Sequence, residues 1–298
     1  MIFTLEALQA KHGDSLLLHF GGGDGASQPD LAVIDGGPAG VYRRTLKPRL
    51  QALKASRAPD DPLPIRLMMV SHIDDDHIHG ILDLTDELVE ARAQRAGEGG
   101  ALPYDVVNFW HNAFEDVLGG AVESSVATVA SVTGASAEEV AADLPVGHEA
   151  ALVLASVPQG MRLRDNARAL GLNLNRPFRG LVAVSPARKS ARFGDLTLTV
   201  VGPDQARVDA LRTDWEKKAA KLAARQLRAE AAAYVDGSVY NLSSIVVLAE
   251  LGGKRMLLTG DARGDHVLAG LEAAGLLDAG GTMHVDLLKL PHHGSEHN

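Results

Sequence analysis

The sequence contains no cysteine, so disulfide bonds and thiolate metal ligands are excluded, and histidine and carboxylate side chains remain for any metal site. No stretch approaches the ~20 apolar residues that a membrane-spanning helix requires. Residues 1–6 lack a basic region and a long apolar core, so no signal peptide is visible and a cytoplasmic protein is expected. The sequence also has no Gly-x-Ser-x-Gly element, the turn that carries a serine nucleophile.

What is present is an ordinary globular composition, 46% hydrophobic and 22% charged, over 298 residues that fit one large domain or two small ones. The net charge of −9 argues against attraction of the whole surface to nucleic acid. A long helix is predicted over residues 207–234, and its lysines and arginines outnumber its acidic residues. This basic face could contact a polyanion, or it could be a solvated helix face.

The densest chemistry lies in residues 71–80, SHIDDDHIHG, which crowd three imidazoles and three carboxylates into one short stretch. The apolar residues 67–70 before it predict a buried strand, and a helical pattern runs from about residue 78 to 96. The stretch is therefore predicted to be a strand-to-helix loop. Carboxylates this close repel one another unless a cation holds them, so a divalent metal ion is predicted here.

The spacing within the loop indicates how metal ions would be shared. Side chains two apart in an extended loop point the same way, so His72 and Asp74 can bind one ion. Asp76 and His77 diverge as the chain enters the helix, so they can reach a second ion. Nitrogen and oxygen ligands without sulfur suit Zn, Mn or Fe. An acidic helix N-cap is the alternative; it explains one aspartate but gives neither histidine a role.

The pattern His-x-Asp-x-Asp-His over residues 72–77, followed by Gly80, resembles the metal-binding signature of the metallo-β-lactamase-fold hydrolases. Most of that superfamily has histidine as the second ligand. Here that position is Asp74, and in this respect the sequence resembles the branch that includes the hydrolase domain of the bacterial DNA-uptake protein ComEC. The resemblance implies an α/β (α+β) fold, a four-layer αββα sandwich in a single domain over residues 1–298, with a helical insertion at about residues 113–177.

Two later elements extend this resemblance. Predicted strands at 245–248 and 255–258 lead to Thr259-Gly260-Asp261, similar to the element whose aspartate bridges both ions. Lys-x-Pro-His-His-Gly-Ser at residues 289–295 resembles the second signature of the ComEC-like branch. The resemblance implies two divalent ions, Mn or Zn, and catalytic roles for Asp76, Asp261 and His293. The implied metal ligands are His72, Asp74, Asp76, His77, Asp261 and His293, with His292 as the alternative to His293.

Four further residues are candidates for supporting the site or contacting substrate. Asp35 is expected beside the ligands, although it could simply cap a helix. His111, at the end of a predicted strand, is either a third nitrogen near the ions or a structural histidine. Asn241 falls where many relatives have a metal-binding histidine, and Lys289 is a candidate phosphate contact.

Apolar alternation and helical spacing predict the other elements. Gly-Asp-Ser at residues 13–15 and Asp-Gly-Gly at 35–37 also resemble the opening hairpins of the superfamily. Strands are expected at 2–10, 15–20, 31–34, 105–110, 181–184, 196–201 and 285–290, and helices at 42–55 and 265–274.

The resemblance implies hydrolysis by a hydroxide that two metal ions activate, without a protein nucleophile. Aspartate at position 74 and asparagine at 241, in place of the histidines of many relatives, give a donor set with less nitrogen and harder ligands. Such a set favours Mn and phosphate oxygens. A phosphodiesterase or nuclease acting on nucleic acid or another phosphodiester is therefore expected. One alternative is a hydrolase of a lactam, lactone or thioester. The other is a non-catalytic or effector module of a larger assembly.

The end of the sequence departs from the family pattern. Relatives usually continue past the His-His-Gly-Ser loop with another strand and a late histidine ligand, whereas this chain stops at Asn298. We therefore expect either a fragment of a longer protein or a partner protein that covers the sheet edge left by residues 285–290. With that ligand missing, the second ion should bind weakly.

Overall fold

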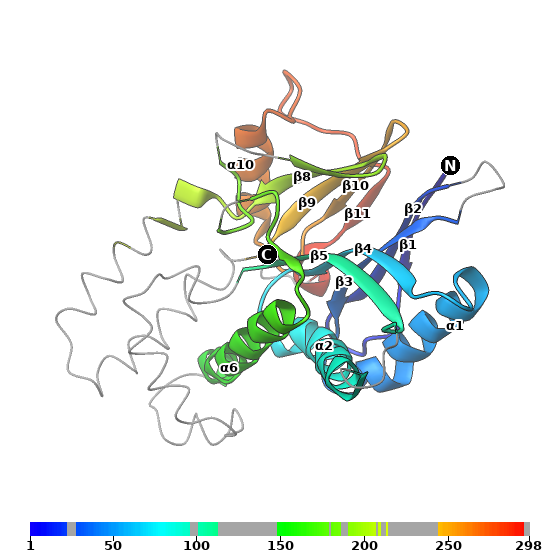
Figure 1. Cartoon of the computed structure of the whole chain (residues 1–298). Coiled ribbons are helices and arrows are strands. Elements are labelled where there is room, and N and C mark those ends of the chain that lie inside the picture. Colours follow the sequence, from blue (N-terminus) through cyan, green and yellow to red (C-terminus); the bar gives the residue numbers. More distant parts are fainter. Residues whose placement is uncertain are drawn as a thin grey trace, which may run out of the picture.

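The computed structural model describes residues 1–22, 28–95, 101–112, 148–178, 180–185, 190–206, 208–209, 213 and 244–294; for 148–158 and 292–293 the description covers the backbone. These residues form two β-sheets and several helices, an α+β arrangement (Figure 1). No helix in these ranges combines the length and apolarity needed to cross a membrane.

The first sheet has the strand order β1-β2-β3-β4-β5-β6. Its first three strands pair antiparallel, and β3 to β6 pair parallel. The carboxyl ends of β3, β4 and β5 therefore meet at one edge, and the turn between β1 and β2 lies at the same edge because Ser15 pairs with Gly36. The strands are β1 Ile2–Ala7, β2 Ser15–Gly21, β3 Asp30–Gly36, β4 Leu63–Val70, β5 Tyr104–His111 and β6 Asn173–Leu174.

The second sheet has the order β11-β10-β9-β8-β7. Only β10 and β11 pair parallel in it, so the residues that follow these two strands also lie side by side. The strands are β7 Ser190–Phe193, β8 Leu196–Gly202, β9 Val246–Leu251, β10 Lys254–Leu258 and β11 Leu287–Lys289.

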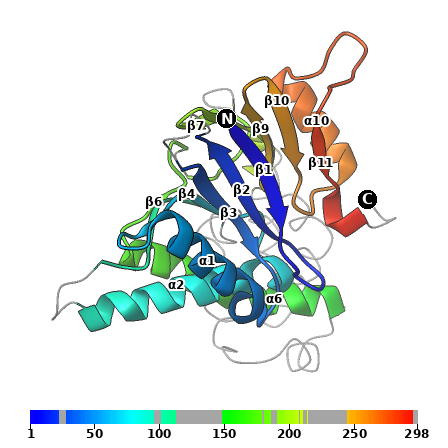
Figure 2. The ribbon, with the colours of Figure 1, turned by 90° about the vertical axis from the view of Figure 1, so that its right-hand side faces the viewer.

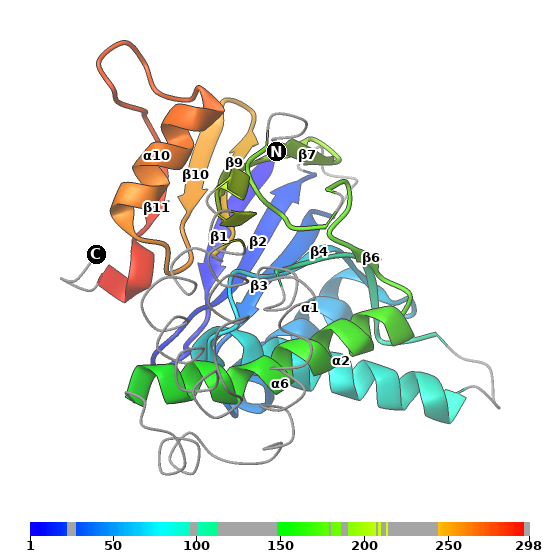
Figure 3. The same ribbon diagram turned by 90° about the vertical axis from the view of Figure 1, so that its left-hand side faces the viewer.

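Three apolar clusters hold the layers together. One lies between the first sheet and its helices, η1 Tyr42–Leu46, α1 Lys47–Arg57, α2 Asp75–Arg95 and α6 His148–Ala169. A second contains residues of both sheets, with Met69 and Trp110 from the first and Leu198 and Val247 from the second. The third joins the second sheet to α10 Gly264–Ala274. Figure 2 shows α10 and α1 on opposite sides of the strands, and Figure 3 shows α6 running beside α2.

The junction between β4 and α2 is set by local sequence and by one close backbone contact. The last four residues of β4 are all buried, as expected for a central strand covered on both faces. Asp75 and Asp76 occupy the first turn of α2, where negative charge is favourable. A Cβ at Gly80 would collide with the carbonyl oxygen of Gly36, so at this point the backbone of α2 lies directly against the backbone of β3.

Most predicted elements occur with shifted ends, and two differ more. The apolar residues 181–184 form no strand, and only Val184 makes an isolated bridge, to Asp204. The strand predicted over 285–290 shortens to β11. Strands β6 and β7 were not predicted from the sequence. The described part of the region 113–177 packs on the first sheet, since α6 contacts α2 and β6 pairs with β5. The predicted helix 207–234 lies almost entirely outside the described residues.

Candidate metal centre

Three buried side chains from both sheets converge at the edge described above. His72 follows β4, His77 lies in the first turns of α2, and Asp261 follows β10. Each offers one ligand atom, and these atoms all lie within 4.8 Å of one another. Buried imidazoles and a carboxylate grouped in this way form a donor set that fits Mn or Zn.

The distances divide the neighbouring carboxylates between the two histidines. Asp74 Oδ2 lies 3.2 Å from His72 Nε2, and Asp76 Oδ1 lies 3.8 Å from His77 Nε2. Asp261 Oδ2 lies between the rings, 3.4 Å from His77 Nε2 and 3.9 Å from His72 Nε2. The structure thus places one carboxylate beside each imidazole and a third carboxylate between them.

Asp35 supports this arrangement from behind. Its Oδ1 accepts a hydrogen bond from the Ser71 backbone N–H at 2.7 Å, and its Oδ2 accepts from the Ser71 hydroxyl at 2.7 Å and from His77 Nδ1 at 2.9 Å. A carboxylate on one ring nitrogen fixes the tautomer and turns the other nitrogen toward the donor group. Asp35 adopts a left-handed φ of 57°, a conformation that aspartate tolerates better than most residues.

The electrostatics of this centre favour positive charge. Burial alone would lower the pKa of His77, but the charge of Asp35 and the hydrogen bonds to Asp261 and Asp35 outweigh it and raise the pKa to about 10. Burial raises the pKa of Asp74, and His72 offsets only part of that effect. A positive charge beside His77 is therefore favoured, and a bound metal ion would supply that charge in place of a proton.

No protein-family model matches this chain, and no curated protein matches it. The chemistry proposed for this centre therefore rests on the residues that form it.

Asp14 is the site residue that sequence reasoning missed. It ends the turn between β1 and β2, and with Asp35 and His77 it forms a second group whose donor atoms lie within 4.8 Å. Gly13, at a φ of 85°, brings this turn so close to the start of α2 that a Cβ there would collide with the backbone of Asp76. The Gly-Asp-Ser element was the available signal, but it had indicated only a hairpin.

The remaining predicted residues lie around this centre or outside the described part of the chain. Lys289, the last residue of β11, contacts Asp14 and Asp261. The backbone of His292 and His293 forms the short helix η4 Pro291–Gly294 immediately afterwards. Asn241 lies outside the described residues. His79, the third imidazole of the loop, pairs with Asp75 at 2.6 Å and belongs to neither donor group.

His111 is buried at the end of β5, outside both donor groups. Its ring stacks on Phe109 with 5.9 Å between centroids, and Gly160 of α6 lies against it. Burial lowers the pKa of His111 to about 4, and the charge of Arg164 adds to this effect. The unfolded chain, with an ordinary histidine pKa near 6.5, therefore binds this proton first as the pH falls.

We expect His111→Leu, a change of similar volume, to make the protein less sensitive to acid. The depressed pKa of His111 does not change the free energy of unfolding above pH 6.5. As the pH falls to about 4, it lowers that free energy by as much as about 3 kcal/mol. Urea unfolding of the metal-free protein between pH 8 and pH 4.5 measures this, with pH 8 as the internal control. Parallel curves for wild type and variant across that range would contradict it.

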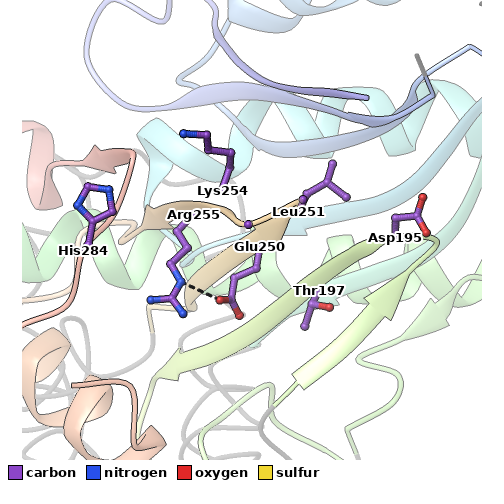
Figure 4. Close-up of a pocket in the computed structure, with 9 residues that line it drawn as sticks. Asp195, Thr197, Glu250, Leu251, Lys254, Arg255 and His284 are labelled. Carbon is purple, nitrogen blue, oxygen red and sulfur yellow. Dashed lines mark hydrogen bonds and ion pairs between the residues drawn. The ribbon is translucent and has the colours of Figure 1, made fainter. Parts of the chain in front are cut away.

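A polar hollow lies apart from this centre at the β9–β10 hairpin, at the far end of these strands from Asp261 (Figure 4). Three of its charged side chains, those of Glu250, Lys254 and Arg255, form ion pairs. Arg255 donates to Glu250 at 3.0 Å, and Lys254 pairs with Asp286 at 2.7 Å. This hollow is therefore a weaker candidate for chemistry than the histidine–aspartate centre.

Proposed function

We propose that this protein is a metal-dependent hydrolase of the metallo-β-lactamase type, and that its two sheets and flanking helices form the four-layer αββα sandwich of those enzymes. The observation that carries the proposal is the convergence of His72, His77 and Asp261 from two different sheets into one buried donor group. A hydrogen-bonding network alone would not explain why residues that follow β4 and β10 meet a histidine of α2 in one buried group.

In this proposal the chain binds two ions, and each ion is bound by residues that lie close together in the sequence and in the structure. His72 and Asp74 hold one, Asp76 and His77 hold the other, and Asp261 lies between them. The ions, when bound, would activate water and stabilise the negative charge that develops on the substrate. Asp35 keeps the His77 ring oriented throughout.

A phosphodiester is the substrate class that we propose. Three carboxylates adjoin the two imidazoles, and oxygen-rich donor sets prefer hard ions such as Mn, which in turn prefer phosphate oxygens. Nucleic acid is the polymeric phosphodiester in this class, and binding of such a polyanion should weaken as salt rises.

The test combines metal analysis with a substrate panel. Purified protein is analysed for Zn, Mn and Fe and assayed with Mn, Mg or Zn on single- and double-stranded DNA, RNA, a chromogenic phosphodiester, a lactam and a thioester. We expect hydrolysis of phosphodiesters, stimulated most by Mn. Turnover of the lactam or thioester alone would replace the proposed substrate class. Absence of metal binding would overturn the hydrolase itself.

A further inference from the structure

A buried ion pair joins the two sheets beside the donor group. The Lys289 ammonium, at the end of β11, contacts Asp14 Oδ2 in the turn between β1 and β2. Both side chains are mostly buried, at 12% and 11% exposure. The same ammonium donates to the carbonyl oxygen of Gly260 at 2.9 Å, and the Thr259 hydroxyl donates to the Lys289 carbonyl at 2.8 Å. Lys289 is thus fixed at both its backbone and its charged end.

This ammonium and the donor group share one carboxylate. Asp261 Oδ1 lies 3.4 Å from Lys289 Nζ, while Asp261 Oδ2 lies 3.4 Å from His77 Nε2. A carboxylate that an ammonium holds by one oxygen presents its other oxygen in a fixed direction. Lys289 therefore acts on the direction in which Asp261 faces the two imidazoles.

The same ion pair bears on the second donor group, formed by Asp14, Asp35 and His77. His77 Nδ1 in this group already donates to Asp35, and Asp14 is paired with Lys289. The ammonium supplies the positive charge that closely spaced carboxylates require. The protein thus provides its own cation in one group, and metal ions are needed only in the other.

We propose that Lys289, held in place by Asp14, is a positioning residue that directs Asp261 Oδ2 toward the metal ions and occupies the second donor group with a permanent positive charge. The inference rests on the proposed function, because it concerns the same centre. It differs from two other roles for Lys289, a purely structural contact between the sheets and a contact with substrate phosphate. Each role predicts a different response to removal of the ammonium.

The experiment measures binding of Mn²⁺ and Co²⁺ by titration, together with the visible absorption spectrum of the Co²⁺ form, which reports ligand geometry. Loss of a partner behind a metal ligand typically weakens binding by roughly 10- to 100-fold. We expect Lys289→Met to raise the dissociation constant within that range and to change the spectrum, and Lys289→Arg to recover part of the affinity. Lys254→Met is the matched control, because its ammonium pairs with Asp286 at 2.7 Å in the same sheet, far from the donors.

Wild-type metal affinity and spectrum in Lys289→Met would overturn the positioning role. If the KM for the phosphodiester were also raised in that variant, Lys289 would be reassigned to substrate binding. If Lys289→Met fails to fold because Asp14 has lost its ammonium partner, the double variant with Asp14→Asn removes the carboxylate charge and is measured in its place. A double variant with the wild-type spectrum would equally overturn the role. Failure of the wild-type protein to bind either ion would overturn the centre itself, a result distinct from unaffected variants.

Discussion

Asp261→Ala is expected to remove most of the bound metal and to reduce hydrolysis by more than about 100-fold. Loss of a residue behind a ligand costs roughly 10- to 100-fold, and Asp261 lies between both imidazoles, so its loss should exceed that range. Elemental analysis and phosphodiester turnover in Mn measure the two effects. Asp265→Ala is the matched control, since this exposed carboxylate lies in the first turn of α10 and pairs with Arg263, the residue before that helix. Retention of full metal content by Asp261→Ala would show that the donor group is not a metal site.

Gly80→Ala is expected to lower the free energy of unfolding by more than about 2 kcal/mol. Helix propensity alone predicts the opposite sign, because alanine is favoured over glycine inside a helix by roughly 1 kcal/mol. The added Cβ would collide with the backbone of Gly36, and neither α2 nor β3 can yield without displacing the loop between β4 and α2.

Urea unfolding of the metal-free protein measures this effect. Gly160→Ala in α6 is the control, because a Cβ there would meet Ile73 and His111 only at 3.5 and 3.7 Å, ordinary contact distances. That variant should be as stable as wild type or slightly more so. A stabilised Gly80→Ala would mean that the helix and the strand do not touch through backbone.

Local features of the site could be predicted from the sequence. The apolar strand, the acidic loop and the helix that together carry His72 and His77 are contiguous, so their patterns are visible within residues 67–80. Asp35 could be placed only as a neighbour, since its hydrogen bonds to Ser71 and His77 depend on the pairing of β3 with β4.

What could not be predicted depends on contacts between the sheets. Nothing local to Asp14 or Lys289 shows that they meet, because one lies in an early hairpin turn and the other ends a late edge strand. The error at residues 181–184 has a related cause. Their side chains are buried like those of a strand, but their backbone makes only one isolated bridge and joins neither sheet. Apolarity alone does not distinguish a buried strand from a buried irregular segment.

Division of the proposed ligands between two sheets would make ion affinity depend on how the sheets dock. Asp261 reaches the imidazoles only while the apolar layer around Trp110 and Val247 is closed, so binding of an ion would be thermodynamically linked to docking of the sheets. A substitution that loosens that layer, even far from the ligands, would then lower occupancy of the centre. A bound ion would in turn resist separation of the sheets and stabilise the whole interface between them.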